Sequence, residues 1–343
     1  MDEKAKDVGM LKIMFAVAVL AGSMVLFTGC GGYGDKSGAS PTKAPGSSIP
    51  VENQARNPEP RPDEVPQALL KGQFDKVHER FEASFQASVS VAQLKEAYAG
   101  VAGGVTEWKP YSKMQLAGVT HRVWTDPDGR VGLLGVFGDG NVILGLRLQP
   151  LESFPMTDNT PTKLAYGLPV EGEWLVLWGG RNVFANYHYE HETQRYAYDF
   201  IQTEDGSSHR GDPSKNESYY AYGQPILAPQ DGTVVQVVND IKDNDPVGTM
   251  NKEHPAGNVV VIDHGNGEFS ILAHLQEGSA KVKPGDTVKK GDHVGLCGNS
   301  GNSSEPHLHY QVSDRSDLFS GKSVRVHWDG ELDPIQGMVI GGK

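Results

Sequence analysis

The sequence predicts a small α+β domain followed by an all-β domain, and three observations carry this prediction. Apolar residues recur at spacings of three to four from Val65 to Val89 and again over 91–98, which is typical of amphipathic helices. Short alternating runs between 120 and 148, broken by Asp- and Gly-rich turns, predict hairpins. Short strands with glycine turns then fill 187–313 at even spacing, which predicts a sandwich or a barrel.

The first 30 residues read as a targeting segment. Lysines precede an apolar run from Ile13 to Thr28 that is short for a membrane span and ends in Leu-Phe-Thr-Gly-Cys, with Cys30 last. Small residues before a cysteine resemble the lipobox of bacterial lipoproteins. The resemblance implies lipidation of Cys30 and an extracytoplasmic protein anchored to a membrane. An uncleaved anchor and an ordinary signal peptide are the alternatives.

Charge and cysteine content narrow the class of protein. The formal net charge of -12 does not indicate a positively charged surface of the kind that binds nucleic acid. The chain has only two cysteines, so lipidation of Cys30 would leave Cys297 without a disulfide partner. Cys297 stands in the apolar run Val-Gly-Leu-Cys-Gly, where we expect a buried structural thiol.

Between Cys30 and the predicted all-β domain, the amino-acid composition distinguishes three segments. Residues 31–64 are rich in Gly, Ser and Pro and predict a flexible tether. Residues 65–150 form the α+β domain, which resembles cystatin-like or nuclear-transport-factor-like domains without a shared motif. It shows no catalytic constellation, so we expect a binding or spacing module. Core packing is the preferred interpretation of Trp108, Tyr111 and Trp124, and a sugar-stacking patch is the alternative. Residues 151–172 read as an irregular linker.

The all-β domain is predicted over 173–320, with a tail over 321–343, and it contains the chemistry-bearing residues. His307 and His309 are separated by one residue in a segment with strand character, so both side chains would lie on one face. Asp199 stands in the hydrophobic run Ala-Tyr-Asp-Phe, and His274 stands in Ala-His-Leu.

In this order, Ala-Tyr-Asp-Phe, Ala-His-Leu, Gly-Asn-Ser-Gly and Pro-His-Leu-His-Tyr resemble the lysostaphin-type zinc endopeptidases. These are bacterial cell-wall hydrolases with a duplicated hybrid-motif β-fold, a barrel-sandwich. The resemblance implies that Asp199 and His309 bind Zn²⁺ and that peptidoglycan peptides are the substrate. It also implies that His274 and His307 remain unligated and act on water and substrate. The sequence has no His-Glu-x-x-His helix, and it does not decide which of the two histidines is the base.

The third zinc ligand departs from the family pattern. The family places a histidine four residues before the aspartate, where this chain has Arg195, which cannot bind a metal. His188 is the preferred substitute, because it continues an extended segment. His191, which stands between two glutamates, and a site without a third ligand are the alternatives.

Two other functions compete with the hydrolase. A zinc-free relative could bind wall peptides or regulate another hydrolase, but the four residues of the motifs are all present. The β-turn pattern also resembles biotinyl and lipoyl carrier domains. Lys289 and Lys290 stand in the wrong turn for a carrier lysine, and a carrier would not need His-x-His.

Overall fold

The computed structural model describes residues 60–342, so the predicted signal segment, Cys30 and most of the predicted tether lie outside the described residues. The described chain begins with short helices: η1 (Pro62–Glu64), α1 (Val65–Leu70), α2 (Phe74–His78), α3 (Ala83–Ser88) and α4 (Val91–Ala102). An antiparallel sheet follows in the order β1-β2-β3-β4, with bounds Lys109–Leu116, Val119–Thr125, Val131–Phe137 and Ile143–Pro150, and with η2 (Asp139–Asn141) before β4. No helix within this part of the chain is long and apolar enough to cross a membrane.

The predicted helical run over 65–89 is divided into three helices by local signals. Gly72 takes a positive φ of 69° just after α1, a conformation in which glycine ends a helix without strain. Glu82 accepts a hydrogen bond from the amide of Ser84 at the start of α3, and Ser90 forms a capping box with Gln93 at the start of α4. Of the three aromatic side chains expected in the core, Trp108 and Trp124 are buried and Tyr111 is half-buried.

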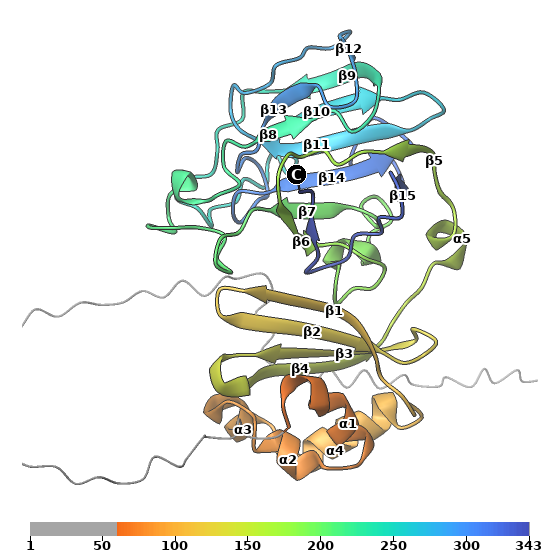
Figure 1. The fold of residues 1–343 in the computed structure, drawn as a ribbon, viewed down its shortest axis with the longest axis vertical. Coiled ribbons are helices and arrows are strands. Elements are labelled where there is room, and N and C mark those ends of the chain that lie inside the picture. The colour runs from red at the N-terminus through yellow and green to blue at the C-terminus, as the bar shows by residue number, and fades with distance from the viewer. Residues whose placement is uncertain (1–59, 343) are drawn as a thin grey trace, which may run out of the picture. The chain divides into compact units, whose positions relative to one another are not determined.

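The second part of the chain is mostly β, as predicted. A ten-stranded sheet has the path β12-β9-β10-β11-β14-β7-β6-β16, with β15 and β5 attached through β14, and β13 pairs with β8 (Figure 1). The strands are β5 (Pro161–Tyr166), β6 (Trp174–Trp178), β7 (Tyr198–Ile201), β8 (Pro225–Leu227), β9 (Gly232–Val238), β10 (Asn258–Asp263), β11 (Phe269–Leu275), β12 (Thr287–Val288), β13 (His293–Leu296), β14 (Leu308–Ser313), β15 (Ser323–Trp328) and β16 (Val339–Ile340). The short helices are α5 (Pro155–Asp158), η3 (Tyr187–Glu190) and η4 (Asn216–Ser218).

The central strands are buried on both faces. Every residue of β7 and β14 is buried, and β10 and β11 are buried except at one end. One face packs into a core that includes Trp174, Phe200, Tyr310 and Trp328. Polar residues on these strands are therefore removed from bulk water, and they need partners within the protein.

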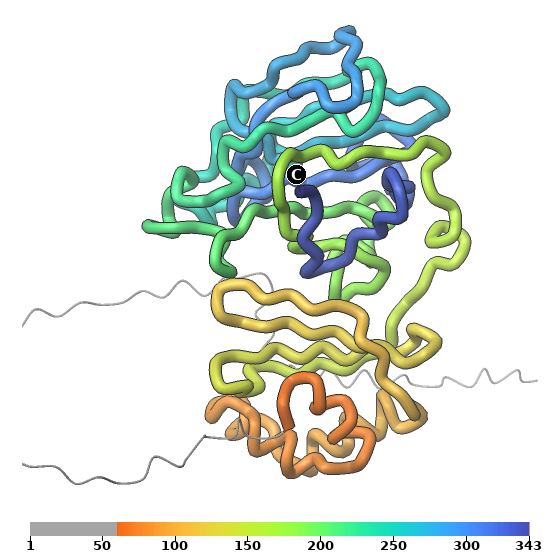
Figure 2. The backbone as a smooth tube through the Cα atoms, viewed as in Figure 1, coloured from red at the N-terminus to blue at the C-terminus, as the bar shows by residue number. Residues whose placement is uncertain are grey.

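Two segments differ from the sequence-based expectation. The predicted linker contains β5, and the predicted tail contains β15 and β16. β5 pairs in parallel with β15, and β16 pairs with β6, so the chain end returns beside the segment that enters the domain (Figure 2). Each of these strands is stabilised by a partner far away in the sequence, and β16 has only two residues. Their pairing therefore has no local signal in the sequence.

Candidate metal centre

Neighbouring strands place the predicted site residues side by side. His309 on β14 lies directly opposite Asp199 on β7, and on its other side it lies opposite Ala273 on β11. Directly opposed residues on adjacent strands have their side chains in contact range. His274 follows Ala273, and His307 lies one residue before β14 rather than within a strand.

The turn η3 contributes the third side chain of a possible metal site. Donor atoms of His188, Asp199 and His309 all lie within 4.8 Å of one another, and the three residues are buried. His309 Nδ1 lies 3.0 Å from Asp199 Oδ1, and His188 Nε2 lies 3.7 Å from Asp199 Oδ2. Zinc bonds of about 2.1 Å in a tetrahedron separate ligand atoms by roughly 3.4 Å. Two nitrogens and a carboxylate at these separations fit zinc, and three ligands leave the fourth position open.

The two sequence alternatives for this side chain occupy different environments. His188 points into the cluster, whereas His191 is exposed at the end of η3 and is not among the clustered residues. Arg195, at the position where the resemblance leads us to expect a histidine, lies with its guanidinium 3.3 Å from the ring centroid of Phe154 and donates to the Tyr189 carbonyl. The geometry therefore favours His188 over His191.

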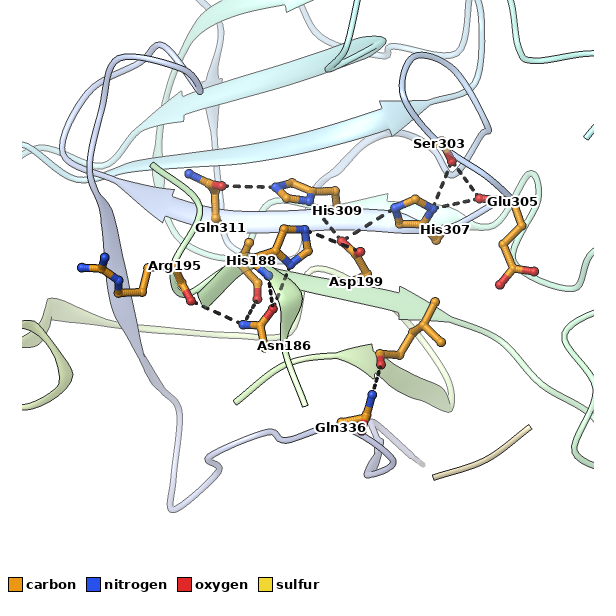
Figure 3. A network of polar contacts seen from close by, with 12 residues as sticks. Asn186, His188, Arg195, Asp199, Ser303, Glu305, His307, His309, Gln311 and Gln336 are labelled. Atoms are coloured by element: carbon orange, nitrogen blue, oxygen red, sulfur yellow. Dashed lines mark hydrogen bonds and ion pairs between the residues drawn. The ribbon is translucent and has the colours of Figure 1, made fainter. Parts of the chain in front are cut away.

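Side-chain amides orient two of the imidazoles. Asn186 Oδ1 lies 2.9 Å from His188 Nδ1, and Gln311 Oε1 lies 3.2 Å from His309 Nε2 (Figure 3). An acceptor at one ring nitrogen holds the proton there and leaves the other nitrogen free to bind a metal. The amide nitrogens are held in turn, that of Asn186 by three backbone carbonyls and that of Gln311 by the Thr193 carbonyl.

His274 is positioned by a distortion at the end of β11. Its φ is +62°, and the pairing of β10 with β11 skips it, since Asn258 pairs with Leu275 and Val259 pairs with Ala273. A bulge with a left-handed residue redirects its side chain, and such backbone conformations in residues other than glycine are concentrated at functional sites. His274 Nδ1 lies 2.8 Å from the Ser300 carbonyl. A carbonyl only accepts, so Nδ1 carries the proton and Nε2 is free.

His307 completes the cluster of rings. Its ring centroid lies 4.8 Å from that of His274, and the centroid of His274 lies 5.8 Å from that of His309. His307 Nδ1 lies 2.8 Å from the Glu305 carbonyl, so this ring also presents Nε2, which lies 3.7 Å from Asp199 Oδ1. Two imidazoles with free Nε2 atoms thus stand beside the possible metal site.

Burial determines the charge state of the centre. It lowers the pKa of His188 to about 3, and the partly opposing charge of Asp199 does not reverse the effect. Burial, reinforced by His307 and His309, holds the pKa of His274 well below its usual value. Burial opposes the ionisation of Asp199, yet the neighbouring His188, His307 and His309 lower the pKa of this carboxyl overall. At neutral pH the centre therefore presents neutral nitrogens of His188 and His274 and an anionic carboxylate.

The sequence motifs point to four of these residues and not to the groups that orient them. Asn186, Gln311 and the Ser300 and Glu305 carbonyls are absent from the sequence-based prediction. The only available signal is the position of Gln311 two residues after His309, which places both side chains on the same face of β14. Outside the centre, Cys297 is fully buried, and burial raises the pKa of its thiol, as expected of a structural cysteine.

Part of this chain is similar to known peptidases. The model of Peptidase family M23 matches residues 217–324. Peptidoglycan DD-endopeptidase ShyA of Vibrio cholerae is 38% identical over 91 residues, which are 26% of this chain and 17% of the relative. DD-carboxypeptidase/endopeptidase Mpg of Neisseria meningitidis is 42% identical over 56 residues, which are 16% of this chain and 12% of the relative.

A solved structure of a putative M23 peptidase from Pseudomonas aeruginosa is 19% identical, covers 64% of this chain and 73% of its own, and has a TM-score of 0.29. The matched stretches are less than a fifth of the length of ShyA and Mpg. The family match contains His274, His307 and His309, whereas His188 and Asp199 precede it.

Proposed function

We propose that this chain is a zinc metallopeptidase that hydrolyses peptide bonds in bacterial peptidoglycan. The observation that carries the proposal is the buried group of His188, Asp199 and His309, with the free Nε2 atoms of two further histidines beside it. The relatives named peptidoglycan DD-endopeptidases support peptidoglycan peptides as the substrate class.

The three clustered side chains would hold the zinc ion, and His274 and His307 would move protons. A zinc ion in such a site supplies Lewis acidity to a water molecule and to the scissile carbonyl. His274 is kept neutral by burial and presents a lone pair at Nε2, so it is suited to accept the proton of the attacking water. His307, in the form that carries a proton on both ring nitrogens, would donate the Nε2 proton to the leaving amine, and proton exchange with solvent would then restore both histidines. The buried surroundings exclude competing water and strengthen these interactions.

The proposed location is the cell envelope, with the protein attached through a lipid on Cys30. The lipobox-like motif supports this part of the proposal, and Cys30 lies outside the described residues. In membrane fractionation of the expressing bacterium, we expect the wild-type chain with the membranes and Cys30→Ser in the soluble fraction. An unchanged distribution of Cys30→Ser would contradict lipid anchoring.

The test of the proposed function is the zinc content per full chain, measured with the release of peptides from purified peptidoglycan. We expect about one zinc ion in the wild type, the same content in His191→Ala, and loss of zinc and of hydrolysis in His188→Ala. Loss of zinc only in His191→Ala would be consistent with the proposed hydrolase and would identify His191, rather than His188, as the third zinc ligand. A wild-type chain without zinc at neutral pH, after zinc has been added, would contradict the proposal.

The second candidate function is a zinc-free wall-binding or regulatory protein. The observation that favours it is the replacement of the family's first histidine by Arg195, which stacks on Phe154 instead of facing the cluster. Binding of the wild-type chain to peptidoglycan, without zinc and without the release of peptides, would select this function.

A further inference from the structure

The loop before β14 contains a buried carboxyl group that the proposed mechanism does not use. Glu305 is 1% exposed. Its Oε2 accepts a hydrogen bond from Ser208 Oγ at 3.1 Å, and its Oε1 has no hydrogen-bond partner among the described residues. Burial raises the pKa of Glu305 to about 7, although the Ser208 hydroxyl opposes the shift. A buried carboxyl group that lacks a full set of partners opposes folding, so packing alone does not account for it.

The backbone of the same residue holds His307. The Glu305 carbonyl lies 2.8 Å from His307 Nδ1 and 2.8 Å from Ser303 Oγ, and Ser303 Oγ lies 3.1 Å from the same ring nitrogen (Figure 3). Pro306 follows Glu305 and restricts the backbone between the carbonyl and the histidine. The direction of the His307 ring therefore depends on where this carbonyl is held.

The Glu305 side chain connects this carbonyl to a second segment of the site. Ser208 belongs to the chain between β7 and β8, which begins soon after Asp199. The hydrogen bond from Ser208 to Glu305 thus joins the segment that follows a possible zinc ligand to the loop that orients His307. Ser304, between Ser303 and Glu305, is exposed and provides a matched control position.

We propose that Glu305 is a positioning residue for the hydrolase: its side chain, bonded to Ser208, fixes the carbonyl that holds the proton on His307 Nδ1 and so directs Nε2 to the reaction centre. This inference rests on the proposed function, in which His307 donates a proton. Displacing a reacting group by about 1 Å can reduce a rate on the order of a hundredfold. The expected effect therefore falls on kcat, because the substrate does not contact the buried side chain.

The kinetic test compares variants of the zinc-loaded full chain on a soluble peptidoglycan peptide. We expect Glu305→Ala to lower kcat by roughly 10-fold to 100-fold with KM and zinc content unchanged. Glu305→Gln should stay close to wild type, since the amide keeps the shape and can still bond Ser208. Ser208→Ala should lower kcat less, and adding it to Glu305→Ala should have no further effect, because both remove the same hydrogen bond.

A kinetic result can also overturn the proposal. Wild-type kcat in Glu305→Ala would do so, as would a loss that Glu305→Gln fails to restore, or an equal loss in the Ser304→Ala control. If Glu305→Ala does not fold, Ser208→Ala decides: a lower kcat at constant KM supports the proposal, and a wild-type kcat overturns it.

A second readout does not depend on activity. Nitrogen-15 NMR of the metal-free full chain reports which ring nitrogen of His307 carries the proton. We expect the proton on Nδ1 in the wild type and in Glu305→Gln, and a mixture of both forms in Glu305→Ala. An unchanged Nδ1 proton in Glu305→Ala would overturn the positioning role. A wild type with the expected NMR signal but without hydrolysis would instead contradict the proposed function alone.

Discussion

At the scale of single residues, the acceptors at the ring nitrogens that face away from Asp199 are uncharged. Asn186 and Gln311 hold two rings, and backbone carbonyls hold His274 and His307. A carboxylate in any of these places would stabilise the protonated ring, whereas a neutral oxygen fixes the tautomer with a smaller effect on the pKa. For His188 and His274, whose pKa values burial lowers, this arrangement preserves the neutral ring, which is the form that binds a metal or accepts a proton.

Replacing His307 with Ala should separate catalysis from metal binding. We expect His307→Ala to retain about one zinc ion per chain and to lose roughly 100-fold to 10,000-fold in kcat, because a proton donor is removed and no ligand is. The measurements are metal analysis and peptide release, with His191→Ala as the exposed control. Loss of zinc together with activity would show that His307 is a ligand.

The low pKa of His188 makes the stability of the metal-free chain depend on pH. The pKa is about 3 in the folded chain and 6.5 in an ordinary histidine, so between these values the unfolded chain binds a proton that the folded chain does not. The free energy of unfolding should therefore fall as the pH falls from about 6.5 towards 3, by up to about 1.4 kcal/mol per pH unit for each such residue. Burial of His274 acts in the same direction.

Denaturant titrations at several pH values check this dependence. His188→Gln, which cannot take up the proton, should have a shallower slope than wild type, and the exposed neighbour variant His191→Gln is the control. A wild-type slope in His188→Gln would contradict the assignment of the effect to His188.

At the scale of elements, the loop between β13 and β14 supports His274 through close backbone packing. Gly301 has a φ of +83°, and a Cβ atom there would lie 2.8 Å from Gly257 Cα, which is too close for any side chain. The preceding residue, Ser300, supplies the carbonyl that holds the His274 ring. The two glycines thus allow this loop to approach β10 closely enough to orient a ring on β11.

Replacing Gly301 with Ala should destabilise the chain by more than about 2 kcal/mol, because the left-handed backbone and the contact with Gly257 both oppose a side chain. The matched control is Gly248→Ala, since Gly248 has a φ of +94° but open space around its Cβ position. We expect about 1 to 2 kcal/mol for the control. If chemical denaturation gives the same decrease in the free energy of unfolding for Gly301→Ala and Gly248→Ala, the close contact with Gly257 does not contribute to the cost of a side chain.

At the scale of the whole molecule, a strand near the chain end completes the core behind the site. Trp328 on β15 is 1% exposed and lies against the rings of Tyr198, Phe200 and Tyr310, which flank Asp199 and His309 along β7 and β14. The face of the sheet opposite the metal centre is therefore packed by a segment that the sequence-based domain boundaries leave outside the domain.

Trp328→Ala should cost about 3 to 5 kcal/mol of the free energy of unfolding, as expected for a large side chain removed from a core. His327→Ala, an exposed neighbour on the same strand, should cost less than about 0.5 kcal/mol. Urea denaturation of the full chain measures both. A loss in Trp328→Ala no larger than that in His327→Ala would contradict the role of β15 in the core.

The sequence predicts the parts of this molecule that depend on local pattern. The β-rich second half follows from the pattern of short strands and glycine turns, and the grouping of Asp199, His274 and His309 is implied by the resemblance of their motifs to lysostaphin-type endopeptidases. The choice between His188 and His191 depends on how η3 folds back, which periodicity does not encode. The pairing of β5 with β15 and the hydrogen bond between Ser208 and Glu305 join segments far apart in the chain. A single sequence has no short-range signal for such pairs.

The left-handed backbone of His274 also has an evolutionary consequence. Asparagine is among the few residues that tolerate this conformation, and its codons differ from those of histidine by one nucleotide. One base change could thus produce a chain that keeps its fold and its proposed zinc ligands but lacks the proposed base. Descendants that bind the cell wall without cutting it are therefore readily accessible from a hydrolytic ancestor.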